Sequence, residues 1–351
     1  MRIIQTFWTA KGSPYLSTYG WPHPRYNAMS WVLSCLCLQQ HFNNIELYTD
    51  TAGYQFLIEK LGLPYKEVHV VLDDFSCLPY HWALSKIKVY SMQKKAFVHI
   101  DGDVYLPNGL PHSFLTAKLA VQNKEFGTEY YKRMTNGILA CEQIHVPAIA
   151  QEGICRKSVP SYNMGLFGGT DLDFIHRYCI EAFKFIDENH LNNPRYSHVA
   201  TNCNIFVEQI LLAIMAEREQ RDIHCLIKGV FRDNGYSSAD FCDFKHFEKR
   251  QILHILGGHK RRQENYLMLE KTLLRLFPDY YKKIMALFPE NYERGYKEIV
   301  NQTRGSSGVH LYDNFIRTAS SKWKDIKTEE LFYIDCSVSQ NLTYYSLPKE
   351  E

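Results

Sequence analysis

The 351-residue sequence has no excess of charge of either sign. Forty Lys and Arg residues face 38 Asp and Glu residues, so the formal net charge is +2 at pH 7. Without a basic stripe or an acidic block, the composition argues against a nucleic-acid partner and against a disordered tail. With 45% hydrophobic residues, the chain suits one large α/β domain with an appendage, or two domains of ordinary size.

Three further features are missing. No run approaches the roughly 20 apolar residues of a membrane helix. The ten cysteines include the C-x-C pair Cys35 and Cys37 but no C-x-x-C spacing typical of a metal site. The opening residues MRIIQTFW lack the apolar stretch of a signal peptide and are typical of a strand. We therefore expect free thiols, no transmembrane segment and a cytoplasmic protein.

The first hundred residues alternate between short apolar runs and helical patterns. Such βαβ alternation predicts a mostly parallel sheet with helices on both faces. Strands are predicted at 2–6, 45–49, 67–72 and 96–100, and helices at 26–40, 51–61 and 82–92.

The middle of the chain is less regular. Thr170 and Asp173 have the spacing of a capping box that opens a helix toward Glu188. Further strands are predicted at 118–122 and 163–167, a strongly apolar helix at 202–219, and a last short element at 254–256.

The sequence pattern changes after residue 260, from alternating strands and helices to short helices joined at prolines. Pro278 and Pro289 each follow a phenylalanine and precede an acid, which is typical of a helix start. We expect short helices to about Val300 and a strand at 331–334. The chain is therefore divided into an α/β domain, residues 1–260, and a mostly helical C-terminal extension, residues 261–351.

The strongest chemical signal follows the predicted strand at 96–100. Asp101 and Asp103 stand one residue apart at its carboxyl end, where open parallel sheets bind ligands. Because extended side chains alternate, both carboxylates point the same way and can share one cation. Gly102 between them lets a phosphate approach closely. Oxygen ligands of this kind suit Mg²⁺ or Mn²⁺, which often bind substrate phosphates as well.

This segment resembles the DxD motif of GT-A glycosyltransferases. A second match, far along the chain, reads H-x-x-G-x-x-K, as in the glycogenin-like and lipopolysaccharide-galactosyltransferase-like family. The resemblance implies that His254 completes a metal site with Asp101 and Asp103. It also implies that Gly257 and Lys260 meet the diphosphate of the donor. A neutral imidazole is a sound third ligand, and an ammonium offsets phosphate charge.

Two further segments match the same family by position. Asn163-Met164-Gly165 resembles an Asn-x-Gly segment that lines the donor and acceptor pocket, and Glu208-Gln209 falls where the family carries an acid–Gln pair. The resemblance implies catalytic roles for Asn163, Glu208 and Gln209. Judged from its apolar neighbours alone, Glu208 is either a buried structural acceptor or a sugar-contacting group.

Three residues are expected near the nucleoside and phosphates of the donor. Trp8 and Asp50 follow the first two strands, whose ends flank the nucleoside in this fold, so Trp8 could stack on the base and Asp50 could bond the base or ribose. Lys86 precedes the DxD strand, where many GT-A enzymes place a basic residue toward the donor. The alternatives are ordinary packing for Trp8 and a solvated helix lysine for Lys86.

Taken together, the resemblance implies a GT-A fold and a metal-dependent hexosyltransferase that uses Mn²⁺ or Mg²⁺. The donor is expected to be a nucleotide-diphosphate sugar, with UDP favoured, and the acceptor is an unknown glycan, lipid-linked molecule or protein. Retention of anomeric configuration is expected; an inverting enzyme would need a base such as Asp171 or Glu152. Arg261 and Arg262 stand where the family often has Pro-Trp, which points to a neighbouring, less described bacterial family.

Other functions are less favoured. A haloacid-dehalogenase-like phosphatase also has an Asp-x-Asp strand end, but this chain has Tyr105 where Thr or Val is usual, and a βαβαβ unit precedes the motif. A nucleotidyltransferase expects a richer glycine loop than Lys11-Gly12-Ser13-Pro14. A degenerate GT-A domain could act only as a binding module. The aromatic, basic C-terminal helices could dock peripherally on a membrane, although a simple cap of the domain is favoured.

Overall fold

The computed structural model describes residues 1–232 and 241–288 and four C-terminal strands, at 315–317, 322–325, 331–335 and 343–346. The chain falls into two compact units, each made of several stretches. Because the units are interleaved along the sequence, the predicted division at residue 260 stays a prediction. Unit 1 comprises Met1–Trp8, Ser34–Thr51 and Pro64–Ile255, and unit 2 comprises Thr9–Leu33, Ala52–Leu63 and Leu256–Glu351.

Unit 1 is built on one mixed sheet with the strand order β3-β2-β1-β4-β7-β6-β8, and β9 also pairs with β6. The first four strands are parallel to one another, whereas β7 runs antiparallel to both β4 and β6. The predicted α/β fold with a mostly parallel sheet is therefore confirmed. The strands are β1 Arg2–Phe7, β2 Ile45–Thr49, β3 Glu67–Val70, β4 Phe97–Ile100, β6 Ala120–Phe126, β7 Pro160–Gly169, β8 His224–Cys225 and β9 Val230–Phe231.

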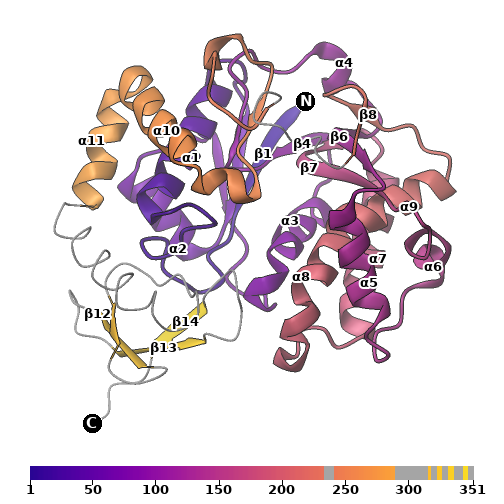
Figure 1. Cartoon of the computed structure of the whole chain (residues 1–351). Helices are drawn as coiled ribbons and strands as arrows, with labels where there is room; N and C mark the ends of the chain where they lie inside the picture. The colour runs from indigo at the N-terminus through magenta and orange to yellow at the C-terminus, as the bar shows by residue number, and fades with distance from the viewer. Residues whose placement is uncertain (233–240, 289–314, 318–321, 326–330, 336–342, 347–351) are drawn as a thin grey trace. The chain divides into compact units, whose positions relative to one another are not determined.

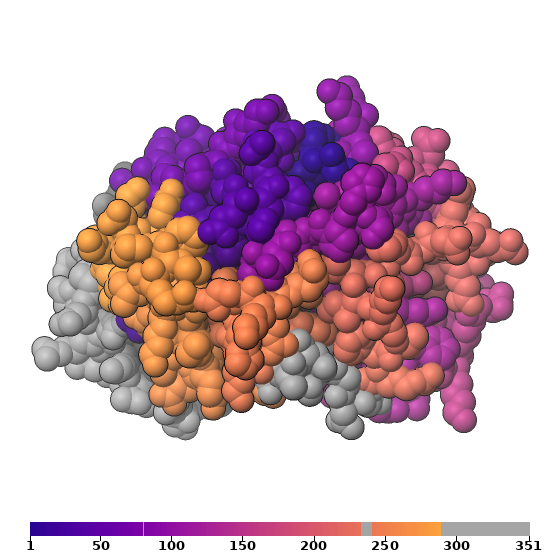
Figure 2. All heavy atoms as spheres, turned by 90° about the horizontal axis from the view of Figure 1, so that it is seen from above, coloured from indigo at the N-terminus to yellow at the C-terminus, as the bar shows by residue number. Residues whose placement is uncertain are grey.

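The helices of unit 1 cover this sheet. In Figure 1, α3 lies beside both α7 and α8, and α9 packs against β7. Both β8 and β9 pair in parallel with β6. Seen from above in Figure 2, the salmon-coloured part of the chain that follows α9 lies at the surface. The helices are α3 Trp82–Ser91, α4 His112–Leu115, α5 Glu129–Leu139, α6 Ala148–Ile154, α7 Leu172–Glu188, α8 Ser197–Ile205 and α9 Leu211–Arg218.

One predicted helix start was wrong in detail. The side chain that caps α7 belongs to Asp171, whose Oδ1 accepts a hydrogen bond of 3.1 Å from the backbone N–H of Phe174. Thr170 and Asp173 therefore do not form the predicted capping box. The helix begins one residue later than that box requires, because β7 runs on through Gly169 and Thr170 still bonds the backbone of Lys118.

The stretch Pro194–Arg218 is long and apolar enough to span a membrane by length and composition, and its most apolar 18-residue window has a mean hydropathy of 1.5. Its most apolar window is 83% buried within the fold, so packing of a core helix accounts for that composition. The prediction of an apolar helix at 202–219 is confirmed. The prediction that no run approaches membrane length overlooked this stretch.

Between α8 and α9 the chain makes a π-helical turn, η4, at Phe206–Ile210. A π turn shifts the backbone hydrogen-bond ladder by one residue, and such turns are frequent at functional sites. The Tyr178 hydroxyl of α7 lies 2.8 Å from the carbonyl oxygen of Val207 and 2.9 Å from that of Glu208. This buried tyrosine therefore fixes the backbone from which Glu208 projects.

Unit 2 contains the predicted C-terminal helices. The predicted strand at 331–334 is confirmed as β13. Helices were predicted to continue to about Val300, and the part of that prediction after Phe288 lies outside the described residues. Beyond that point the structure describes an antiparallel sheet in the order β11-β12-β13-β14. The helices and strands are α1 Pro24–Gln39 and α2 Thr51–Tyr54 (each shared between the units), the π turn η1 Gln55–Lys60, α10 Gln263–Leu276, α11 Pro278–Leu287, β11 Phe315–Arg317, β12 Lys322–Asp325, β13 Leu331–Asp335 and β14 Thr343–Ser346.

The cysteines agree with the expectation from their spacing. Every cysteine in the described ranges is free, and most are buried. Burial raises the pKa of both Cys35 and Cys37 to about 12, so these thiols are protonated at neutral pH and pack as small apolar side chains.

Candidate functional site

The strand order places a switch point beside the Asp-Gly-Asp segment. The chain runs from β1 to β2 to β3 on one side and then returns to place β4 on the other side of β1. In open α/β sheets, ligands bind outside the carboxyl ends of the strands at such a point. Asp101 follows β4 there, and its backbone N–H donates to the carbonyl oxygen of Gly165 at 2.9 Å, which extends the pairing with β7.

A short two-stranded sheet brings the distant histidine to this position. β5, Val104–Tyr105, pairs antiparallel with β10, Leu253–His254, so that Val104 lies opposite His254. The backbone N–H of Ile255 also donates to the carbonyl oxygen of Asp103 at 3.2 Å. This backbone pairing, between segments about 150 residues apart, sets the His254 ring beside the carboxylates.

The three predicted metal ligands do converge. One potential ligand atom from each of Asp101, Asp103 and His254 lies within 4.8 Å of the other two. His254 Nδ1 lies 2.7 Å from Oε1 of the buried Gln122 and donates to it, because an amide oxygen only accepts. In the neutral imidazole the other ring nitrogen, Nε2, carries the lone pair, and it lies 3.5 Å from Asp103 Oδ1.

These donors fit a divalent cation. A separation of 3.5 Å is too long for a good hydrogen bond, whereas two ligands that bind one cation at about 2.1 Å lie about 3 to 3.5 Å apart. A metal-bound histidine usually donates its second ring N–H to a neighbouring acceptor, which fixes its tautomer. In this structure the acceptor for that N–H is Gln122 Oε1. Asp101, Asp103 and His254 are therefore the residues that could hold Mn²⁺ or Mg²⁺.

Lys86 is not a solvated lysine. It lies on α3, is buried, and its Nζ donates to both carboxylate oxygens of Asp101 at 3.0 Å and forms an ion pair with Glu208. Burial alone would lower the pKa of the ammonium, but the two carboxylates outweigh it and raise the pKa above its usual range. Lys86 therefore carries a positive charge between the predicted metal ligand Asp101 and the predicted catalytic carboxylate Glu208.

The carboxylates around Lys86 outnumber it. Burial raises the pKa of Asp101 to about 7; Lys86 opposes the rise, and the charges of Asp103 and Glu208 add to it. His99 offers little compensation, because burial and the nearby Lys86 hold its pKa well below the usual range and keep the ring neutral. The carboxylates therefore carry more negative charge than Lys86 neutralises, and a divalent cation would supply further positive charge.

The predicted acid–Gln pair faces the same cluster. Gln209 Nε2 donates to Glu208 Oε2 at 3.3 Å, and the hydroxyl of Tyr131 on α5 donates to Gln209 Oε1. Glu208 is 3% exposed, so the side chain belongs to the interior and reaches the site through Lys86. The sequence left two alternatives for Glu208, a buried acceptor or a sugar-contacting group. Its burial agrees with the first, and a contact with sugar stays a prediction.

Asn163 and Gly165 contribute in different ways. Asn163 Oδ1 accepts from the backbone N–H of Gly165 at 3.0 Å, which fixes this stretch of β7. A Cβ on Gly165 would lie 2.6 Å from Gln122 Oε1 and 2.6 Å from two atoms of the His254 ring. The Asn-x-Gly segment thus provides the space in which His254 and Gln122 meet.

Glu125 on β6 is a buried acid that contacts the predicted site residue Asn163 and was not predicted from the sequence. It is 2% exposed, and burial raises its pKa to about 8, opposed by hydrogen bonds from Tyr131, Asn163 and Asn123. It is therefore protonated at neutral pH, and its Oε1 has no hydrogen-bond partner among the described residues. The strand was predicted to end at 122, whereas β6 continues to Phe126, with Asn123 opposite Asn163 and Glu125 opposite Ser161 of β7.

Trp8 and Asp50 lie at the carboxyl ends of β1 and β2, as predicted, and both are buried. The Trp8 ring meets Phe75 edge-on with a centroid separation of 5.4 Å, so it has a packing role. Contacts of either residue with a nucleoside stay predictions.

Gly257 and Lys260 belong to unit 2, whereas the residues above belong to unit 1. Gly257 has a φ of +49°, a conformation that favours glycine, and begins a 3₁₀ turn, η6 Gly257–Arg261. Lys260 Nζ donates to the carbonyl oxygen of Tyr19 at 2.9 Å and lies 5.9 Å from the ring centre of Trp21. Their expected contact with a diphosphate stays a prediction.

The two residues offered as an alternative general base have other partners. Asp171 caps α7 and pairs with Arg221 at 3.3 Å, and both residues line a depression of about 410 Å³ that none of the predicted site residues borders. The Glu152 side chain is 90% exposed and pairs with Arg156, which lies just beyond the end of α6. Neither carboxylate is linked by a contact to the cluster around Lys86.

Comparison with known proteins places the chain in one family. The chain belongs to a family of unknown function, DUF6734, which matches residues 1–287. That range contains every residue of the candidate site. No curated protein matches the sequence.

The close approach at Gly165 leads to a first prediction. In a Gly165→Ala variant, the added methyl group should push His254 and Gln122 apart, and the affinity for Mn²⁺ should fall about 10- to 100-fold. Calorimetric titration with Mn²⁺ measures this. Gly258→Ala is the matched control, because a Cβ there meets nothing within 4 Å. Equal affinities in wild type and Gly165→Ala would show that His254 does not ligate the metal.

The charge balance leads to a second prediction. Lys86→Met keeps the apolar stem but leaves Asp101 and Glu208 without their cation. Loss of one partner from a buried ion pair should lower the free energy of unfolding by about 3 kcal/mol, measured by urea denaturation. Mn²⁺ should restore part of the loss, since it supplies positive charge to Asp101. Lys88→Met, at a half-buried lysine on the same helix, should have little effect; an equal loss there would contradict the assignment.

Proposed function

We propose that this protein is a metal-dependent glycosyltransferase of the GT-A type, which transfers a hexose from a nucleotide-diphosphate sugar. The observation that carries the proposal is the convergence of Asp101, Asp103 and His254 at the carboxyl end of β4. Two oxygens and one imidazole nitrogen that face one another at a switch point suit a cation that also binds phosphate. The resemblance of the same residues to the DxD and H-x-x-G-x-x-K motifs supports the same conclusion.

The cation, when bound, would act as a Lewis acid on the leaving diphosphate. Asp101 has two oxygens, so one can remain with Lys86 while the other ligates. Lys86 then positions Asp101 and offsets the charge of Glu208, and Gln122 keeps the His254 lone pair directed at the cation. Lys260 is proposed to meet the diphosphate, and Trp8 and Asp50 the nucleoside, with UDP favoured by the resemblance alone.

The sugar side of the proposed site consists of Glu208, Gln209, Asn163 and Glu125. A carboxylate such as Glu208 can stabilise a positively charged sugar in the transition state, and an amide such as Gln209 can orient a hydroxyl. Glu125 is neutral at pH 7, so it can donate a hydrogen bond as well as accept one. The open hydrogen-bonding capacity of its Oε1 suits a sugar hydroxyl.

The third prediction tests the metal and the donor together. A panel of nucleotide-sugars is screened by thermal shift with and without Mn²⁺, because a ligand that binds the folded state raises its melting temperature. One nucleoside-diphosphate sugar should raise the melting temperature only when Mn²⁺ is present. Asp103→Ala should abolish this shift and slow Mn²⁺-dependent release of the nucleoside diphosphate at least about 100-fold, since metal catalysis supplies several kcal/mol.

Asp173→Ala, at an exposed aspartate on α7, is the control and should behave as wild type. Binding without turnover would identify a GT-A-like binding module. If no nucleotide-sugar binds in the presence of Mn²⁺, the proposed function is wrong.

The fourth prediction concerns the stereochemistry. We propose that transfer retains the anomeric configuration, with Glu208 steadying the sugar, because the series of motifs resembles a retaining family. Glu208→Gln should then lower the chemical step far more than donor binding, as measured by single-turnover rates and donor titration. Proton NMR of the first product formed from an α-linked donor should show an α-linkage. A β-linked product would overturn both the retaining mechanism and the role of Glu208.

A further inference from the structure

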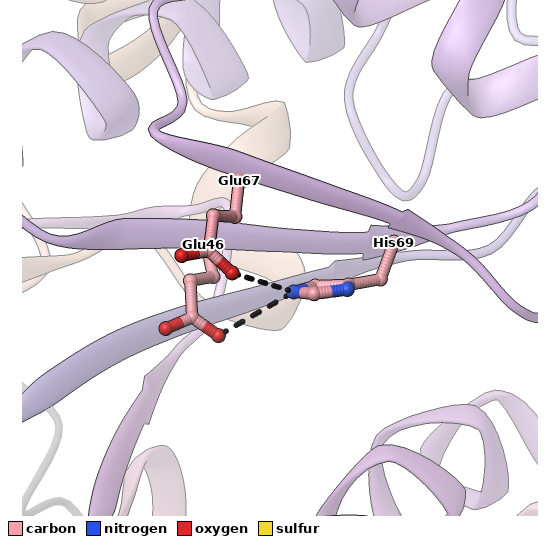
Figure 3. A group of neighbouring side chains, drawn as sticks. All are labelled: Glu46, Glu67 and His69. Atoms are coloured by element: carbon pink, nitrogen blue, oxygen red, sulfur yellow. Dashed lines mark ion pairs between the residues drawn. The ribbon is translucent and has the colours of Figure 1, made fainter.

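A second group of metal-ligand side chains lies on the same sheet, away from the Asp-Gly-Asp segment. It consists of Glu46 on β2 and of Glu67 and His69 on the neighbouring strand β3 (Figure 3). Glu46 is the register partner of Glu67, and Tyr48 is the register partner of His69. Because side chains alternate along a strand, these residues all project from one face of the sheet.

The His69 ring points between the two carboxylates. Its Nε2 lies 3.6 Å from Glu46 Oε2 and 3.6 Å from Glu67 Oε2 (Figure 3). Both distances are too long for hydrogen bonds, and this buried nitrogen has no hydrogen-bond partner among the described residues. Ligands at about 2.0 to 2.2 Å from a tetrahedral cation lie about 3.3 to 3.6 Å apart. The spacing therefore fits three ligands of one ion better than a hydrogen-bonded trio.

Neighbouring side chains hold the group in place. The Tyr48 ring stacks on His69 with a centroid separation of 4.4 Å and an interplanar angle of 25°. Glu46 is buried, and its Oε2 accepts from Arg2 at 3.0 Å and from the Tyr48 hydroxyl at 3.1 Å. Such hydrogen bonds to a ligating carboxylate are typical of metal sites, because they fix its orientation.

We propose that Glu46, Glu67 and His69 bind Zn²⁺ or a similar divalent transition metal. One imidazole and two carboxylates are a suitable donor set for zinc. Arg2 offsets the charge of only one carboxylate, so the group keeps a net negative charge that attracts a cation. The Glu67 side chain is 55% exposed and that of His69 34%, which leaves a fourth position open to water. The ion ties β3, the edge strand of the sheet, to β2.

The competing explanation is an ordinary ion cluster, in which a protonated His69 bridges the two glutamates. The two explanations differ in what happens when zinc is added. Bound zinc per chain is measured by mass spectrometry of the metal content after equilibration with Zn²⁺ and dialysis, for wild type, His69→Ala and Glu67→Gln. Glu67 is exposed, so its variant preserves the fold even if His69→Ala does not.

His69→Ala and Glu67→Gln should each lose one zinc per chain relative to wild type. Two controls should keep this zinc: His41→Ala, at an exposed histidine of the same unit, and Asp103→Ala, in the proposed catalytic centre. In the Asp103→Ala protein, Zn²⁺ should raise the melting temperature, and adding His69→Ala should abolish that rise. Equal zinc contents in wild type, His69→Ala and Glu67→Gln, or no zinc retained by Asp103→Ala, would overturn the proposal.

Discussion

The ion-pair cluster centred on Lys86 is the interaction on which the candidate site depends. Two carboxylates from distant parts of the chain, Asp101 after β4 and Glu208 in the π turn, contact this single buried ammonium. Burying a carboxylate without compensation costs several kcal/mol, and such a group would take up a proton instead. Lys86 thus allows two carboxylates, those of Asp101 and Glu208, to lie close together in the interior.

The helical turn from which Glu208 reaches this cluster, between α8 and α9, is irregular. A regular α-helix would continue the hydrogen-bond ladder through Phe206–Ile210, whereas the π turn offers the carbonyls of Val207 and Glu208 to the Tyr178 hydroxyl. Irregular helical turns persist where the surrounding structure compensates for them. Here the compensation is a buried tyrosine on α7, and the result is a fixed origin for the Glu208 side chain.

Prediction from sequence worked best for local patterns. The strands before residue 100 and the helices between them are set by short apolar runs and breakers, and the structure confirms each of these strands. It worked less well where polar residues lie in a buried strand. Asn123 and Glu125 lie beyond the predicted end of the strand, yet both are buried in β6. Asn123 lies opposite Asn163 of β7, and Glu125 is hydrogen-bonded by Asn163 and by Tyr131 on α5.

What the sequence determined by itself is the chemistry available at the end of β4: the apolar strand, the two carboxylates and, by resemblance, a histidine 150 positions later. Alternation and strand propensity are local properties, so residues 96–104 suffice to predict them. Only the tertiary structure decided that His254 lies opposite Val104, that Lys86 is buried between Asp101 and Glu208, and that Gln122 directs the imidazole. Those contacts join segments far apart in the chain, and their energies depend on burial and on partner geometry, which no local pattern encodes.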